Sequence, residues 1–423
     1  MEKADYIKDL KRLSFVKSNS GVKLLPKGVI HGSHCPMHTS IKLTNSIEGV
    51  SSLIVGTQEC ATYSRMVVKN PYGKHEELHW MYVLDSNEVV FGCRDGLIDA
   101  LIEMDKHGAK AIMIIVTCVP ELIGEDIESV IYEIQENILA KLMFVMVGHF
   151  KCNGYSSGIW KSLKAFTNIM DERTVLPHMI NVLSENKKYV NTAFLKKILS
   201  ADIDINYLGM GGSLEDFMEA PRASINIVLT SSCLPLAQEM KMKFGTPYIC
   251  LHNIYSIEEI DEAYKQIGEY INVNLADNFS EERNELFQLQ DEVREKVKGM
   301  KYVTTDSNID PIPMSIYLSK MGMEPLLLHV EEFYEEDKQI SKKLFDLGYN
   351  PLVCHIVSDL AGEFITENLH PEFSFGYIDT KGDKKTPSIS DLHRINGTFG
   401  YERTINLIRS VIDELGKVSK GGE

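Results

Sequence analysis

The stretch AIMIIVTCVPELIGEDIESV, residues 111–130, decides the fold that we expect for this chain. It opens with six apolar residues, passes through Thr117 and Cys118, and continues as an amphipathic helical pattern. Residues 52–65, SLIVGTQECATYSR, repeat the same order of strand, turn and helix around Cys60. Strands that alternate with helices predict a parallel sheet covered by helices. Both cysteines are then expected at the carboxyl ends of strands, where ligands bind.

The alternation of strands and helices continues to the end of the chain in three groups. We therefore predict an α/β protein of three Rossmann-like domains, each a mainly parallel four- to five-stranded sheet flanked by helices. The predicted divisions are an N-terminal arm (1–40), domain 1 (41–170), domain 2 (171–300) and domain 3 with a C-terminal helix (301–423). EVVFG, residues 88–92, is one of the predicted strands of domain 1.

Composition and charge narrow the class of protein. The 423 residues are 44% hydrophobic and 25% charged, and the formal net charge of −16 argues against nonspecific binding to nucleic acid. No apolar run reaches the ~20 residues of a membrane span, and the charged start MEKADYIKDLKRLSF does not resemble a signal peptide, so we expect a cytoplasmic protein. The eight scattered cysteines favour reduced thiols. Without GxGxxG after a first strand and without GxxxxGK[ST], neither a dinucleotide site nor ATP hydrolysis by this chain is expected.

Three cysteines are the leading metal-ligand candidates. Cys35 lies in GVIHGSHCPMHTS, residues 28–40, and joins Cys60 and Cys118. Their wide separation is unlike the C-x2-C spacing of a zinc ribbon or a small ferredoxin. A thiol at a strand end also faces a helix N-terminus, which lowers its pKa and suits it to bind metal. Any one of them alone can be a small buried hydrophobe; the three together favour ligation of an iron–sulfur cluster.

The remaining candidates have weaker support. Cys233 follows the strand pattern INIVLTSSC, and is either a ligand of a separate cluster or a core residue. Cys93 and Cys152 are accessory candidates for a fourth ligand, with packing the favoured role. His393 lies in the loop before the last helix, where a structural role is favoured.

These sequence contexts resemble nitrogenase component 1, the α/β subunit family that includes nitrogenase-like reductases and cofactor-assembly scaffolds. The resemblance rests on HGSHC, GTQECATYSR, VTCVPELIGEDIESV, SINIVLTSSC and GYERTINLI, and it runs through nearly the whole chain. It implies that Cys35, Cys60 and Cys118 ligate a [4Fe–4S] or larger P-type cluster at the interface with a homologous sister subunit. It also places Cys233 where members of this family hold a second iron–sulfur metallocofactor.

Several positions depart from the catalytic members of the family. Trp160 and Lys164 stand where a Gln and a His face the cofactor, and Arg403 replaces a usual glycine. The His that completes cofactor ligation aligns with Ser390, and His393 is only a displaced candidate. These departures argue against dinitrogen reduction and leave electron transfer through the interface cluster intact.

The resemblance therefore implies a subunit of a nitrogenase-like oxidoreductase in a homo- or heterodimer or tetramer. It would accept electrons from a separate ATP-dependent iron protein through the interface cluster and deliver them to a metallocofactor or substrate. The alternatives are a scaffold for assembly of a nitrogenase-type cofactor, a tetrapyrrole-reductase-like subunit in which Cys233 is core, and a metal-free α/β binding protein. Neither nucleic acid nor membrane is an expected partner.

Overall fold

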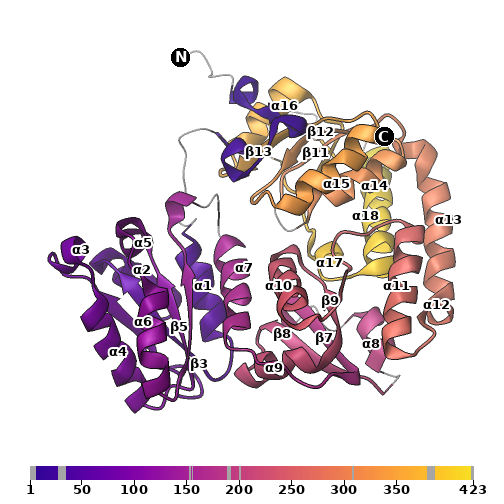
Figure 1. The fold of residues 1–423 in the computed structure, drawn as a ribbon. Coiled ribbons are helices and arrows are strands. Elements are labelled where there is room, and N and C mark those ends of the chain that lie inside the picture. Colours follow the sequence, from indigo (N-terminus) through magenta and orange to yellow (C-terminus); the bar gives the residue numbers. More distant parts are fainter. Residues whose placement is uncertain are drawn as a thin grey trace, which may run out of the picture. The chain divides into compact units, whose positions relative to one another are not determined.

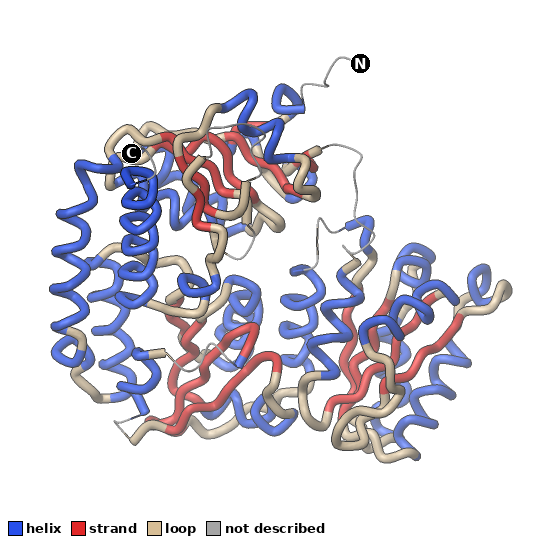
Figure 2. The backbone as a smooth tube through the Cα atoms, turned by 180° about the vertical axis from the view of Figure 1, so that it is seen from behind, coloured by secondary structure: helices blue, strands red, loops and turns tan. Residues whose placement is uncertain are grey.

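The computed structural model of the chain describes residues 6–26, 35–151, 154, 156–187, 192–199, 202–306, 309–378 and 386–420. These residues belong to two compact units. Unit 1 comprises Met1–Gly32, Asn191–Ile198 and Cys250–Glu423, and unit 2 comprises Ser33–Val190 and Leu199–Ile249. The described strands gather into three separate sheets, each bordered by helices, which confirms the predicted α/β class (Figures 1 and 2). The predicted domain boundaries stay predictions.

The first sheet, in unit 2, has the strand order β4-β3-β5-β6 and is parallel throughout. Its strands are β3 (Val50–Gly56), β4 (His79–Val83), β5 (Ala111–Val116) and β6 (Lys141–Met146). Every residue of β3 and β5 is buried, as expected for central strands covered on both faces.

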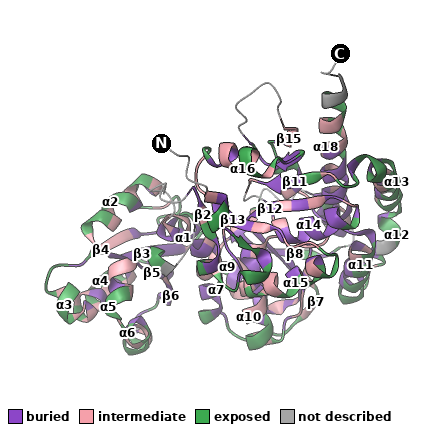
Figure 3. Ribbon diagram, turned by 90° about the horizontal axis from the view of Figure 1, so that it is seen from above, coloured by how far each residue is buried: buried purple, intermediate pink, exposed green. Residues whose placement is uncertain are grey.

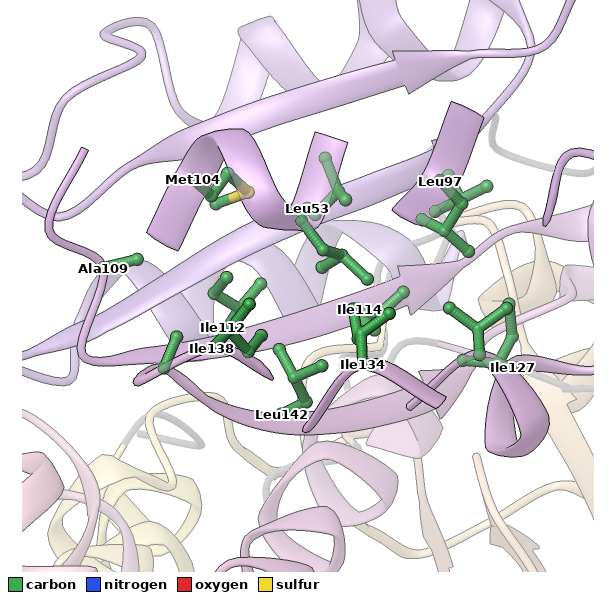
Figure 4. Close-up of a cluster of buried hydrophobic side chains, with 14 of the residues drawn as sticks. Leu53, Leu97, Met104, Ala109, Ile112, Ile114, Ile127, Ile134, Ile138 and Leu142 are labelled. Carbon is green, nitrogen blue, oxygen red and sulfur yellow. The ribbon is translucent and has the colours of Figure 1, made fainter. Parts of the chain in front are cut away.

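Helices of unit 2 surround this sheet: α1 (Pro36–Asn45), α2 (Gln58–Val67), α3 (Glu88–Phe91), α4 (Arg94–Lys106), α5 (Cys118–Ile123), α6 (Ile127–Ile134) and α7 (Ser156–Ala165). Two further helices of unit 2, α9 (Leu214–Glu219) and α10 (Leu234–Phe244), pack against strands of the second sheet. Figure 4 shows side chains of α4 and α6, among them Leu97 and Ile134, packed with Ile114 of β5 in one cluster. α6 begins at a capping carboxylate, because Asp126 Oδ1 accepts a hydrogen bond of 3.0 Å from the backbone N–H of Ser129.

The prediction of a strand at EVVFG, residues 88–92, is wrong. Residues Glu88–Phe91 form the short helix α3, and the edge strand beside β3 is the preceding HWMYV segment, β4. The apolar side chains of α3 are not in the core: Val90 is 70% exposed and Phe91 is 85% exposed. Hydrophobicity alone does not distinguish a short apolar helix from a buried strand.

The second sheet, also in unit 2, has the order β10-β9-β7-β8. Its strands are β7 (Leu176–Asn186), β8 (Asp204–Met210), β9 (Ala223–Val228) and β10 (Tyr248–Cys250). β7 pairs in parallel with β8 and β9. The 3-10 turn η9 (Ser231–Cys233) follows β9 and leads into α10, so Cys233 lies at the carboxyl end of this sheet.

The third sheet, in unit 1, contains five strands from the last part of the chain and two from the arm. The first five are β11 (Lys301–Thr304), β12 (Glu324–His329), β13 (Leu352–Ile356), β14 (Phe373–Phe375) and β15 (Ser388–Ile389). β1 (Lys11–Arg12) pairs antiparallel and β2 (Lys23–Leu25) parallel with β13, so the sheet has seven strands. The arm strands are too short to show a sequence pattern of their own. They are strands only because they pair with β13.

The remaining helices are α8 (Ala193–Leu199), α11 (Ile257–Ile271), α12 (Leu275–Asn278), α13 (Ser280–Val297), α14 (Pro311–Lys320), α15 (Glu335–Asp346), α16 (Ala361–Leu369), α17 (His393–Asn396) and α18 (Gly400–Lys420). Within the described ranges, none of the helices combines the length and apolar character that crossing a bilayer requires.

Candidate metal centre

Cys60 and Cys118 lie close together along the carboxyl ends of the strands of the first sheet, here called the carboxyl edge, because their strands are neighbours. β3 and β5 pair in parallel, with Val55 opposite Val116, and the N–H of Thr117 donates to the Val55 carbonyl oxygen at 3.0 Å. Cys60 is the third residue of α2, and Cys118 is the first residue of α5. Both thiols are partly exposed, so this edge can offer two sulfur ligands to a group outside the core.

A glycine lets the two strand ends approach each other. A Cβ atom on Gly56 would lie 2.2 Å from Thr117 Oγ1, 3.1 Å from Cys60 Cβ and 3.3 Å from Cys60 Sγ. Real side chains do not tolerate the first of these distances. The Thr117 hydroxyl is itself fixed, since it donates to the Val55 carbonyl oxygen at 2.8 Å. The turn that carries Cys60 therefore requires glycine at position 56.

Opposing influences act on the pKa of the Cys118 thiol. Burial raises its pKa above the ordinary value, and the neighbouring Cys60 sulfur adds to the rise. A hydrogen bond from the backbone of His149 lowers the pKa and opposes both. The ring of His149 is also in contact, with Nδ1 2.8 Å from Cys118 Sγ. The Cys60 sulfur is therefore close enough to Cys118 to act on its thiol.

The sequence prediction did not include His149. It begins the 3-10 turn η5 (His149–Lys151), directly after β6, whose carboxyl end lies beside that of β5. Gly148 precedes it, and the Gly148 N–H donates to Glu121 Oε2 of α5 at 2.6 Å. The available signal was its position: His149 follows a strand of the same parallel sheet, as Cys60 and Cys118 do.

Cys35 lies immediately before α1 and is partly exposed. α1 packs against α2, α7 and β3. The ring centroids of His38, one turn after Cys35, and Tyr63, one turn after Cys60, are 6.5 Å apart. α1 and α2 are therefore neighbours, and Cys35 lies at the start of α1.

The three candidate thiols have the donor chemistry of iron–sulfur cluster ligands. In the described part of the chain, no three His, Cys, Asp or Glu side chains lie close enough together to hold one ion. Thiolates bind different irons of a cluster, so they need not meet around one centre. The chain contributes three candidate thiols where a cluster takes four ligands.

Cys93 and Cys233 are placed differently from this group. Cys93 is 1% exposed in the core of the first sheet, where burial and the nearby Glu125 raise its pKa to about 12. Cys233 is fully buried at the start of α10, and burial raises its pKa to about 12. The Thr230 hydroxyl donates to Cys233 Sγ at 3.3 Å. Both thiols are sealed by protein in this conformation.

The last two accessory candidates stay predictions. Cys152 lies outside the described residues. His393 belongs to unit 1, where it begins α17, is exposed, and donates its N–H to Asp391 Oδ1 at 3.0 Å.

Two of the residues that depart from the catalytic members of the family line a cavity in unit 2. Trp160 and Lys164 border a space of about 290 Å³ between β6, α7 and α10. Lys164 Nζ pairs with Glu239 at 3.1 Å, so the charge of this lysine is largely compensated. The cavity is a separate feature, because it contains none of the three leading cysteines.

Comparison with known proteins identifies the family. A model described as nitrogenase component 1 type oxidoreductase matches residues 35–415. The nitrogenase iron-molybdenum cofactor biosynthesis protein NifE of Nostoc sp. is 24% identical over 277 residues, which is 62% of this chain but only 57% of that protein. The nitrogenase molybdenum-iron protein alpha chain of Methanothermobacter thermautotrophicus is 23% identical over 412 residues, covering 91% of this chain and 85% of that one.

A solved structure, nitrogenase Cp1 at pH 6.5, has the same fold with a TM-score of 0.70 at 15% sequence identity, covering 93% of this chain and 94% of that chain. The family match covers every strand of the three sheets except β1 and β2, and all three leading cysteines, Cys35, Cys60 and Cys118. The chain belongs to the nitrogenase component 1 family of oxidoreductases.

Proposed function

We propose that this chain is a subunit of a nitrogenase-like oxidoreductase that receives electrons through an iron–sulfur cluster at the interface with a homologous sister subunit. The electrons would come from an ATP-dependent iron protein and pass to a metallocofactor or substrate. The observation that carries the proposal is the placement of Cys60 and Cys118, both partly exposed, after the carboxyl ends of two neighbouring parallel strands.

The incomplete donor set supports a shared cluster. Cys35, Cys60 and Cys118 would supply three thiolates, and the remaining ligands would come from the sister subunit. The partner's ligands then decide between a [4Fe–4S] and a larger P-type cluster. Such a cluster, when bound, supplies one-electron transfer. The protein's part is to hold the thiols, limit water access and direct hydrogen bonds to the sulfurs.

Exposed apolar side chains near the carboxyl edge support an interface. Phe91 of α3, Met66 of α2 and Leu122 of α5 are 85%, 67% and 73% exposed. Figure 3 shows how much of α2, α3 and α5 is exposed. α3 and α5 contact each other, and α2 and α5 carry Cys60 and Cys118. Exposed apolar patches mark interaction sites, and we assign Met66, Phe91 and Leu122 to the interface with the sister subunit.

A scaffold for cofactor assembly is the second candidate. Cys233 is fully buried with a thiol pKa of about 12, so a cofactor held there requires this part of unit 2 to open. Opening suits a protein that receives and releases its cargo. The same burial also fits a tetrapyrrole-reductase-like subunit in which Cys233 is only a core residue.

The test begins with the complex that the chain forms in its host, purified without oxygen. Cys35→Ser, Cys60→Ser and Cys118→Ser are each expected to lose iron and acid-labile sulfide. Cys250→Ser is the matched control, since Cys250 lies in β10 of the second sheet, and it should retain both. Full iron in all three variants would refute the cluster assignment.

Two further measurements separate the candidate functions. Reduction of the cluster by the iron protein only with ATP supports the oxidoreductase. Failure of ATP and iron protein to reduce it, with transfer of a metal species to an acceptor protein, supports the scaffold. Cys233→Ala should remove a second metal species if Cys233 is a ligand and leave the metal content unchanged if it is core.

A further inference from the structure

Two backbone hydrogen bonds just before His149 fix it beside Cys118. The N–H of Val147 donates to the Val116 carbonyl oxygen at 2.9 Å, which ties the end of β6 to the end of β5. The next residue, Gly148, donates its N–H to Glu121 of α5. A Cβ on Gly148 would lie 2.6 Å from Glu121 Oε2, so the turn closes tightly around this carboxylate.

This turn directs two groups of His149 at one sulfur. The ring Nδ1 is 2.8 Å from Cys118 Sγ, and the backbone of His149 also hydrogen-bonds Cys118. A thiolate that ligates metal has no proton to give, so in that state the bond requires Nδ1–H to donate to sulfur.

The distance distinguishes a donor from a second ligand. Metal–sulfur and metal–nitrogen bonds of about 2.3 and about 2.0 Å, at a tetrahedral angle, place the two ligand atoms about 3.5 Å apart. The observed 2.8 Å is shorter than this separation. His149 and Cys118 therefore do not share one iron in this geometry.

We propose that His149 is a positioning residue that donates a hydrogen bond from Nδ1 to the ligating sulfur of Cys118 and raises the reduction potential of the cluster. The inference rests on the proposed function, because it needs a cluster on Cys118. A donor to a ligating sulfur withdraws electron density from the iron and stabilises the reduced state, as hydrogen bonds around iron–sulfur clusters do.

The test compares anaerobic complexes of wild type, His149→Ala and His149→Asn. Asparagine carries a side-chain N–H near the position of Nδ1 and is the rescue variant. His107→Ala is the matched control, since His107 is also an exposed histidine of unit 2 but bonds to Glu103 instead. Each protein is measured for iron content and for midpoint potential in a titration followed by electron paramagnetic resonance.

In His149→Ala we expect unchanged iron and a redox equilibrium shifted about tenfold towards the oxidised cluster, which is about 59 mV for a one-electron couple. His149→Asn should recover most of the shift, and His107→Ala should show none. Loss of iron in His149→Ala would make His149 a ligand and overturn the inference. Full iron with an unshifted potential in His149→Ala would overturn this inference and leave the proposed function standing. A wild-type complex without iron would overturn both.

Discussion

Replacing Gly56 with alanine adds a methyl group to the turn that carries Cys60. The new Cβ lies 2.2 Å from Thr117 Oγ1, so the hydroxyl must move and its hydrogen bond to the Val55 carbonyl oxygen is lost. Overpacking a tight site costs about 1–3 kcal/mol, and a lost hydrogen bond adds about 1 kcal/mol. We therefore expect Gly56→Ala to lower the free energy of unfolding by about 2–4 kcal/mol.

A double variant tests the cause. Thr117→Ala removes the atom at 2.2 Å, so Gly56→Ala/Thr117→Ala should be more stable than Gly56→Ala alone, with a coupling of about 1–2 kcal/mol. The contacts of 3.1 and 3.3 Å to Cys60 Cβ and Sγ remain, so both variants should contain less iron than wild type. Urea unfolding followed by circular dichroism measures stability, and elemental analysis of the anaerobic complex measures iron.

Gly416→Ala is the control, because a Cβ there meets no atom within 4 Å. It lies inside α18 and should leave iron unchanged while stabilising the helix by up to about 1 kcal/mol. Wild-type stability and iron in Gly56→Ala would show that the strand ends are not packed as described.

Three further predictions concern pH, helix capping and association. Burial lowers the pKa of His79 to about 4, below the unfolded value of 6.5, so the unfolded chain binds the extra proton and stability falls as pH drops from 6.5 towards 4. Between pH 7.5 and 4.5 the loss in the free energy of unfolding is about 2–3 kcal/mol. The variant His79→Gln should therefore make the urea midpoint less dependent on pH. An equal pH dependence in the variant and the wild type would contradict the lowered pKa of His79. Asp126→Ala should lower the free energy of unfolding by about 1 kcal/mol through the lost cap of α6, and Asp126→Asn far less; equal effects of the two variants would show that the cap is unimportant. Phe91→Glu should weaken association with the sister subunit in native mass spectrometry without changing the stability of the isolated chain, since Phe91 is 85% exposed, and unchanged association would exclude α3 from the interface.

The central strands could be predicted because all of their residues are buried. AIMIIV is buried on both faces of the first sheet, so its continuous apolar run and the strand coincide. EVVFG has the same appearance in the sequence, but its side chains point to solvent from α3. What separates the two segments is the tertiary packing around each of them, and a single sequence does not show tertiary packing. The arm strands β1 and β2 were missed for a related reason, since β13 alone makes them strands.

The candidate site was predictable where it depends on local order and not where it depends on distant contacts. Cys60 and Cys118 follow their strands directly, so the strand-end rule finds them. His149 also follows a strand, but its position over Cys118 depends on the hydrogen bond from Gly148 to Glu121, which are far apart in the sequence. The burial of Cys233 likewise depends on packing that the pattern INIVLTSSC does not show.

The central claim is that Cys35, Cys60 and Cys118 together hold an iron–sulfur cluster. Mössbauer spectroscopy of the ⁵⁷Fe-enriched native complex tests it most directly, with the triple variant Cys35→Ser/Cys60→Ser/Cys118→Ser beside the wild type. The account predicts doublets of sulfur-coordinated tetrahedral iron in the wild type that are missing from the triple variant. The same doublets at full intensity in both proteins would contradict it.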